Sequence, residues 1–208
     1  MARTTEPATD RRDRLLDEAL RLLAAGGLQA VTHRAVESAA GVPHGSVTYW
    51  FASRDGLVEA MVDRLAADCE RRVRDLAHDV ALAAARRGPA IDVGSFARAL
   101  MGWMDDGREQ HVARLELELA AVRDPRLAER MTDAALVFWR LCEPIVVAAG
   151  SRHPQRDGRA MAAMVDGLLL DRLAHRPAGA EVVEAALAHL LGDWSGTPER
   201  PSHTGDPA

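Results

Sequence analysis

The stretch "GVPHGSVTYWFASRDGL", residues 41–57, decides the fold predicted for this chain. Gly41 can end one helix in the left-handed conformation, and Pro43 can open the next. Val47 and Phe51 are four residues apart, so they share one face of a short helix predicted over residues 44–51. Tyr49 and Trp50 precede Phe51 directly, and no single helix face can bury three successive aromatic rings. The stretch therefore raises the question of which partner meets Tyr49 and Trp50.

Two helices are predicted before this stretch. The first begins near Asp10, ends at Gly26 and Gly27, and buries a side made of Leu15, Leu16, Ala19, Leu20 and Leu23. The second is capped by Thr32, whose side chain can accept from free backbone N–H groups, and it stops at Gly41. Ser53 is the next natural cap, and a long helix is predicted to follow it as far as about residue 78.

The rest of the chain also has helical spacing of its apolar residues, and strand signals are nearly absent. Further helices are predicted near 91–106, 108–122, 125–149, 156–174 and 180–191, with prolines between several of them. The expected fold is all-α. Residues 1–9 are expected to be a flexible arm, and the Pro/Gly/Ser-rich residues 193–208 a disordered tail.

The charge distribution is uneven. The whole chain has a net charge of −5, and all of its basic residues are arginines. Residues 1–54 contain seven arginines against six acidic residues, a net of +1, which leaves −6 for the rest. This balance argues against a protein that coats nucleic acid along its length, but it permits contact with phosphates by the N-terminal quarter.

Several classes of protein have little support. The two cysteines are far apart in sequence, and His33 and His44 are separated by a turn without companion ligands, so no metal site is predicted. Catalytic and nucleotide-binding motifs such as GxSxG, HExxH and the phosphate loop are missing, so we expect neither an enzyme nor a cofactor. No leader and no apolar run long enough to span a membrane is present, so we expect a cytoplasmic protein without a membrane partner.

Three short helices, with a tight glycine-containing turn between the second and third, are typical of a helix-turn-helix. In that motif the third helix enters the major groove of DNA. Val42, Val47 and Phe51 can hold it against the other two helices, which leaves its opposite face outside. Tyr49 and Trp50 could be core anchors, but we predict that they face DNA and pack on its sugar-phosphate backbone.

Residues 10–57 resemble the DNA-binding domain of the TetR family of transcriptional regulators. The resemblance lies in the glycine-ended first helix, the "AAGV" turn, the "GSVTYWF" recognition helix and the "SRDGL" start of the fourth helix. It implies a helix-turn-helix DNA-binding domain over residues 10–53 and a helical effector-binding and dimerisation domain over residues 54–192.

The resemblance also implies DNA contacts. Thr32 and Arg34 correspond to contacts with phosphate and the first base edges, and Arg54 to a basic residue at a phosphate. The groove-facing and backbone-facing positions of the recognition helix are His44, Gly45, Ser46, Thr48, Tyr49 and Trp50. Thr48 stands where the family often has tyrosine, Trp50 where histidine or tyrosine is usual, and Arg54 where lysine is usual. Thr48 shortens the implied phosphate contact, whereas Arg54 keeps the charge.

The second domain offers candidates for ligand binding and for dimerisation. The ligand-binding candidates are large apolar or charged residues within apolar helices: Trp103, Arg114, Glu118, Phe138, Trp139, Met164 and Asp166. The alternative is that the apolar candidates are core residues and that the charged candidates lie on a solvated face. Gly167 lies mid-helix, which suggests a close helix approach or a pocket. The last two helices have more apolar surface than one stripe needs, and we interpret the surplus as a homodimer interface: Met161, Met164, Val165, Leu168, Leu169, Leu173, Val183, Leu187, Leu190 and Leu191.

The functional expectation is a ligand-responsive, sequence-specific transcriptional regulator that binds a palindromic DNA operator as a homodimer. The favoured role is a repressor that a small molecule of unknown identity releases from the operator. The alternatives are a transcriptional activator and a small-molecule-sensing helical module that acts on a protein partner.

Overall fold

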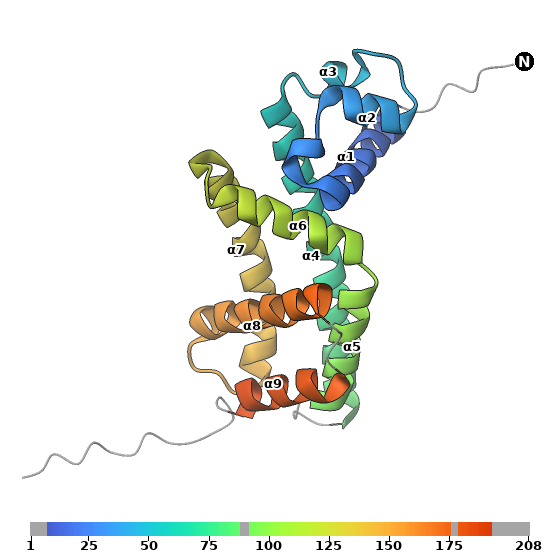
Figure 1. Ribbon diagram of the computed structural model, residues 1–208. Helices are drawn as coiled ribbons and strands as arrows, with labels where there is room; N and C mark the ends of the chain where they lie inside the picture. Colours follow the sequence, from blue (N-terminus) through green and yellow to red (C-terminus); the bar gives the residue numbers. More distant parts are fainter. Residues whose placement is uncertain (1–7, 88–91, 176–178, 193–208) are drawn as a thin grey trace, which may run out of the picture. The chain divides into compact units, whose positions relative to one another are not determined.

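The computed structural model describes residues 8–87, 92–175 and 179–192. Within these ranges every secondary-structure element is an α-helix, so the predicted all-α class is confirmed (Figure 1). The helices are α1 (Ala8–Ala30), α2 (His33–Ala40), α3 (Ser46–Trp50), α4 (Arg54–Arg87), α5 (Val93–Asp105), α6 (Arg108–Ala121), α7 (Pro125–Ala148), α8 (Pro154–Ala174) and α9 (Ala180–Gly192). The expected tail, residues 193–208, lies outside the described residues, as does the expected arm except for its last two residues, which begin α1.

The predicted caps account for several helix ends. The hydroxyl of Thr32 accepts a hydrogen bond from the Ala35 amide at 3.1 Å, at the start of α2. Gly41 ends α2 with φ 63°, a left-handed conformation that glycine adopts without a steric penalty. The hydroxyl of Ser53 accepts from the Gly56 amide at 3.0 Å, at the start of α4. α3 begins later than predicted because Gly45, with φ 87°, keeps the chain out of the helical conformation.

The chain forms two compact units, and each is described by itself. Unit 1 comprises the chain up to Arg74 and residues Gly102–Phe138, and unit 2 comprises Asp75–Met101 and the chain from Trp139 onwards. Helices α4, α5 and α7 therefore each contribute to both units. The expected boundary after residue 53, between a DNA-binding domain and an effector-binding domain, divides the chain differently from these two compact units. That boundary stays a prediction.

Unit 1 has one hydrophobic core that includes the three predicted helix-turn-helix elements. α1 packs against α2 and α6, and α2 packs against α3. Leu16 of α1, Val47 of α3 and Leu117 of α6 are all almost fully buried in this core. The C-terminal end of α1 also approaches α6 closely, since a Cβ added at Gly27 would lie 3.0 Å from the Glu116 carboxylate. The core therefore extends from the predicted DNA-binding helices to α6.

Unit 2 includes α8 and α9, which pack against each other. Six of the ten apolar residues predicted for a dimer interface are buried within the chain itself: Met161, Val165, Leu169, Val183, Leu187 and Leu191. They are core residues rather than a surplus, whereas Leu170 and Val182 on the same helices are exposed. The close approach expected at Gly167 is not found in the described chain, because a Cβ added there meets nothing within 4 Å.

None of the helices in the described ranges is both long enough and apolar enough to cross a lipid bilayer.

Candidate nucleic-acid interface

The two faces of α3 have very different environments. Val47 is fully buried, and Phe51, directly after the helix, is 4% exposed. Tyr49, in contrast, is 80% exposed, although large aromatic side chains are usually buried in a folded protein. The tyrosine ring therefore points away from the core, as the sequence predicts, and presents a hydroxyl and a ring face to the outside.

Trp50 does not follow the prediction fully. Its side chain is half-buried and packs against the core of unit 1, so the expectation that it faces outward with Tyr49 is wrong in part. The two rings meet edge to face, with centroids 5.0 Å apart. The physical reason is the helical rotation, which places Trp50 between the outward direction of Tyr49 and the inward direction of Phe51. Trp50 therefore supports the base of the Tyr49 ring.

A buried carboxylate holds the start of α3. Glu37 of α2 is 4% exposed, and its Oε1 accepts from the backbone amides of Gly45 at 2.8 Å and Val47 at 3.1 Å. Its Oε2 lies 2.9 Å from Nδ1 of His44, whose own side chain is 90% exposed. Burial raises the pKa of the Glu37 carboxyl, but the hydrogen bonds from Val47, His44 and Gly45 outweigh burial, so this pKa lies below its ordinary value. Glu37 is therefore ionised at neutral pH.

Two hydroxyls at the recognition helix have partners within the protein. Ser46 donates its hydroxyl to the Pro43 carbonyl at 2.6 Å, which closes the turn before α3. Thr48 is exposed, and its hydroxyl oxygen lies 3.2 Å from Nδ1 of His33 on α2. Both oxygens keep further hydrogen-bonding capacity, because a hydroxyl can donate once and accept twice.

The three remaining predicted DNA contacts lie near the ends of α2 and α4. Thr32 and Arg34 are exposed at the start of α2, although the Thr32 hydroxyl already caps this helix. Arg54 donates from Nη2 to the Leu28 carbonyl at 2.7 Å and from Nε to the Val31 carbonyl at 3.2 Å. Arg54 therefore ties α4 to the connection between α1 and α2, a role that the sequence did not suggest, and its phosphate contact stays a prediction.

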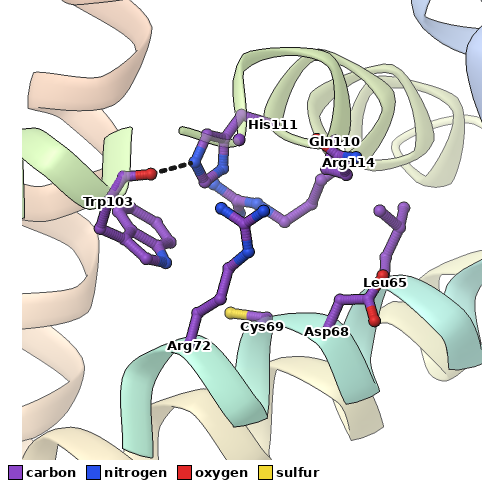
Figure 2. A pocket seen from close by; sticks show the side chains of 9 residues that line it. Leu65, Asp68, Cys69, Arg72, Trp103, Gln110, His111 and Arg114 are labelled. Atoms are coloured by element: carbon purple, nitrogen blue, oxygen red, sulfur yellow. Dashed lines mark hydrogen bonds between the residues drawn. The ribbon is translucent and has the colours of Figure 1, made fainter. Parts of the chain in front are cut away.

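A second cluster of polar groups surrounds a small cavity in unit 1 (Figure 2). The cavity volume is about 30 Å³, and the lining residues are Leu65, Asp68, Cys69 and Arg72 of α4, Trp103 of α5, and Gly107, Gln110, His111 and Arg114 on the α6 side. Nε2 of His111 lies 3.1 Å from the Trp103 carbonyl oxygen, and therefore donates to it. The indole N–H of Trp103 is buried without a hydrogen-bond partner in the described part of the chain. A space of this size accommodates about one water molecule.

The cavity brings together only some of the predicted ligand-binding residues. Trp103 and Arg114 line it, and Glu118 forms an ion pair with Arg114. Phe138 is half-buried in unit 1 but does not line the cavity. The other three candidates lie in unit 2, where the ring of Trp139 is covered by the Arg159 guanidinium at 4.4 Å, and where Met164 and Asp166 are half-buried.

Two family models match this chain, one near each end. Residues 15–61 match the family described as bacterial regulatory proteins of the tetR family. Residues 87–193, just over half of the chain, match the tetracyclin repressor-like C-terminal domain. The chain belongs to the TetR family. It is therefore a DNA-binding transcriptional regulator, as the resemblance of residues 10–57 implied.

Several solved protein structures are similar to this chain over almost their whole length. A TetR family member from Streptomyces coelicolor A3, SCO1917, is 30% identical, with a TM-score of 0.67 over 87% of this chain and 98% of that protein. The multidrug binding protein EbrR, in complex with proflavin, is 32% identical with a TM-score of 0.57 over 86% of this chain and 99% of that protein. GusR of Salmonella enterica, 20% identical with a TM-score of 0.69 over 92% and 100% of the two chains, shares the fold. A search of curated proteins finds no match.

Sequence reasoning missed two groups of residues in this TetR chain. Glu37 occupies a buried position of α2 next to Val36, and a charge on the core side of a short helix is the signal that could have identified it. Arg72 and His111 line the cavity. The sequence signal that could have identified them is the helical spacing of the lining residues. Residues 65, 68, 69 and 72 share one helix face, as do 107, 110, 111 and 114.

Proposed function

We propose that this protein is a homodimeric repressor that binds a palindromic operator and is released from it by a small molecule. The observation that carries the DNA contact is α3 itself: Val47 and Phe51 are buried, whereas Tyr49 is 80% exposed on the opposite face. An exposed aromatic on the outer face of a recognition helix fits packing against a sugar-phosphate backbone. Repression and ligand response are proposed from membership of the TetR family.

In the proposed complex each subunit places one α3 in the major groove. His44, Gly45, Ser46 and Thr48 lie at its start and face the base edges, and Tyr49 packs on the backbone with Trp50 behind it. Thr32, Arg34 and Arg54 lie near phosphates. One helix of this length reads only a few base pairs, and a dimer with two such helices at a fixed spacing reads a palindrome.

The dimer is proposed to form through α8 and α9. Leu170 is 51% exposed and Val182 is 44% exposed, although both lie on helices that also contain buried apolar residues. Exposed apolar residues of this size, next to the half-buried Met164, Leu168, Leu173 and Leu190 of the same helix pair, fit an isologous contact with a second copy. We place the regulator in the cytoplasm, where its proposed operator lies.

The effector is proposed to act through the cavity between α4 and α6. α6 shares the core of unit 1 with α1, so a ligand that displaces α6 also displaces a helix of the DNA-binding motif. A cavity of about 30 Å³ has to open to admit an effector. The indole N–H of Trp103 is buried in this lining without a hydrogen-bond partner among the described residues, which favours an effector with an acceptor group.

Footprinting of the purified protein on the DNA upstream of its own gene tests this proposal. The expected result is protection of a palindrome, which is lost when the effector is added. The compound panel should contrast aromatic carboxylates with the planar dyes proflavin and ethidium, because EbrR has been solved with both dyes. A protein that protects no sequence in this region, nor any sequence selected from random DNA, contradicts the proposed function.

Tyr49→Ala tests the DNA-facing role of α3 more directly. We expect about a tenfold loss of affinity for every operator sequence, because the lost contact is to the backbone and not to a base. The thermal stability should be unchanged, since the side chain is 80% exposed. Val122→Ala, at an 82% exposed position after α6, is the matched control and should retain full affinity in the same mobility-shift titration. Equal affinity of both variants contradicts the assignment.

A further inference from the structure

We infer that Glu37 fixes the tautomer of His44 and thereby selects the class of base that this histidine reads. The inference rests on the proposed placement of α3 in the major groove. Glu37 belongs to α2 and contacts no DNA in this arrangement, so it is a positioning residue. His44 is the specificity-determining residue through which it acts.

The geometry assigns one proton unambiguously. An ionised carboxylate can only accept hydrogen bonds, and Oε2 of Glu37 lies 2.9 Å from Nδ1 of His44. Nδ1 therefore carries the proton. In the neutral imidazole the other nitrogen, Nε2, is then an acceptor. The imidazole is 90% exposed at the start of the recognition helix, so this acceptor is available to a base edge.

An acceptor in the major groove discriminates between bases. Cytosine presents the amino group N4 and adenine the amino group N6, and both can donate to Nε2. Guanine presents only the acceptors N7 and O6 in this groove, and thymine presents O4, so neither can donate to Nε2. The wild-type protein is therefore expected to prefer an amino base, cytosine or adenine, at the position that His44 reads.

The two oxygens of Glu37 have separate duties, which makes the inference testable by one isosteric change. Oε1 accepts hydrogen bonds from the backbone amides of Gly45 and Val47 at the start of the recognition helix, and Oε2 alone faces His44. In Glu37→Gln the amide oxygen can keep the two backbone contacts, and the amide NH₂ then faces Nδ1 and donates to it. The proton of the neutral imidazole moves to Nε2, which becomes a donor. A donor at Nε2 can bond guanine N7 or O6 and thymine O4, but not cytosine, which presents only a donor in this groove. The preference should therefore move from cytosine to guanine or thymine, whereas adenine, with both N6 and N7, can serve either tautomer.

The first experiment determines base preference by selection from a library with randomised operator positions, in slightly alkaline buffer. The position that His44 reads is the one whose preference disappears in His44→Ala. We expect wild type to favour cytosine over guanine there by about three- to tenfold, and Glu37→Gln to favour guanine over cytosine by a similar factor. The double variant Glu37→Gln/His44→Ala should match His44→Ala. An unchanged ratio of cytosine to guanine in Glu37→Gln, or a wild-type preference for guanine, overturns the inference.

The second experiment reads the tautomer without DNA. Long-range ¹H–¹⁵N correlation spectra of the full-length free protein distinguish Nδ1–H from Nε2–H imidazoles, and His44→Ala identifies the signal. We expect Nδ1–H in wild type and Nε2–H in Glu37→Gln. The same tautomer in both proteins overturns the inference even if operator binding is intact. A protein with the expected tautomers that binds no DNA contradicts the proposed function instead, so the two failures are distinguishable.

Discussion

Single residues set the backbone path between α2 and α3. Gly41 and Gly45 both have positive φ angles, 63° and 87°, and no other atoms lie within 4 Å of a Cβ added at either position. The need for glycine at these positions is therefore conformational and not steric. A side chain there would fit in space but would strain the turn that positions the recognition helix.

Gly41→Ala is accordingly expected to lower the free energy of unfolding by about 1 kcal/mol, because the Cβ of alanine is sterically unfavourable in the left-handed conformation. Gly102→Ala, on α5, is the matched control, since a Cβ there also meets nothing within 4 Å and the glycine has no positive φ. That control should raise the free energy of unfolding by about 0.5–1 kcal/mol. Urea unfolding followed by circular dichroism measures both. Effects of the same sign would contradict the conformational explanation.

The Glu37 carboxylate is expected to make stability depend on pH on the acid side. Its pKa in the folded protein lies below the ordinary value of 4.5, so its contribution is present above that value and is lost as the pH falls through the folded-state pKa. Glu37→Gln removes this titration. The difference in free energy of unfolding between wild type and Glu37→Gln should therefore be constant near neutral pH and should change in favour of the variant below about pH 4.5. A difference that does not vary with pH, in unfolding curves measured across this range, would contradict the assignment.

At the scale of elements, α1 and α4 are connected by a network of charges as well as by their core residues. Arg64 of α4 lies 3.0 Å from Asp17 and 3.4 Å from Asp13, both on α1, and 3.3 Å from Asp68 on its own helix. One guanidinium that joins three carboxylates across two helices is better placed to contribute to stability than an isolated surface pair.

We expect Arg64→Ala to lower the free energy of unfolding by about 1 kcal/mol at low salt, and by less as the salt concentration rises. Arg71→Ala is the control, because Arg71 also pairs with Asp68 but makes this contact within α4. Its effect should be below about 0.5 kcal/mol. Thermal unfolding at two salt concentrations compares the variants. Equal effects of the two substitutions would show that the link to α1 adds nothing.

At the scale of the whole molecule, the proposed operator binding requires two surfaces: the outer face of α3 and the exposed apolar positions of α8 and α9. Each lies in a different compact unit of the chain. The proposed DNA-reading surface and the proposed dimer contact therefore belong to separately packed parts of the chain. Function in this proposal depends on both at once, because one α3 alone reads too little DNA.

Leu170→Glu and Val182→Glu should each convert the protein to a monomer, because a charge buried in an apolar interface has no partner there. Operator affinity should fall at least tenfold at the same time, since the second recognition helix is lost. Val147→Glu, at a 54% exposed position of α7, is the control and should leave the dimer intact. Light scattering measures the mass, and mobility shifts measure the affinity. A dimer that persists in both α8 and α9 variants would place the interface elsewhere.

The sequence by itself determined the elements of this protein and the class of its function. Caps at Thr32, Gly41 and Ser53, and apolar spacing of three and four, are local signals. They act over a few residues, so they are readable without any knowledge of packing. The order of these elements in residues 10–57 was enough to imply the TetR family, and the family matches confirm it.

Only the tertiary structure decided which residues meet. The contact of Glu37 with the start of α3, the contact of Arg54 with the α1–α2 connection, and the cavity of Arg72, Trp103 and His111 join residues that are 7–39 positions apart. Helical rotation and core packing also settled that Trp50 is half-buried whereas its neighbour Tyr49 is exposed. Periodicity gives the face of each helix, but the environment of that face depends on which distant element covers it.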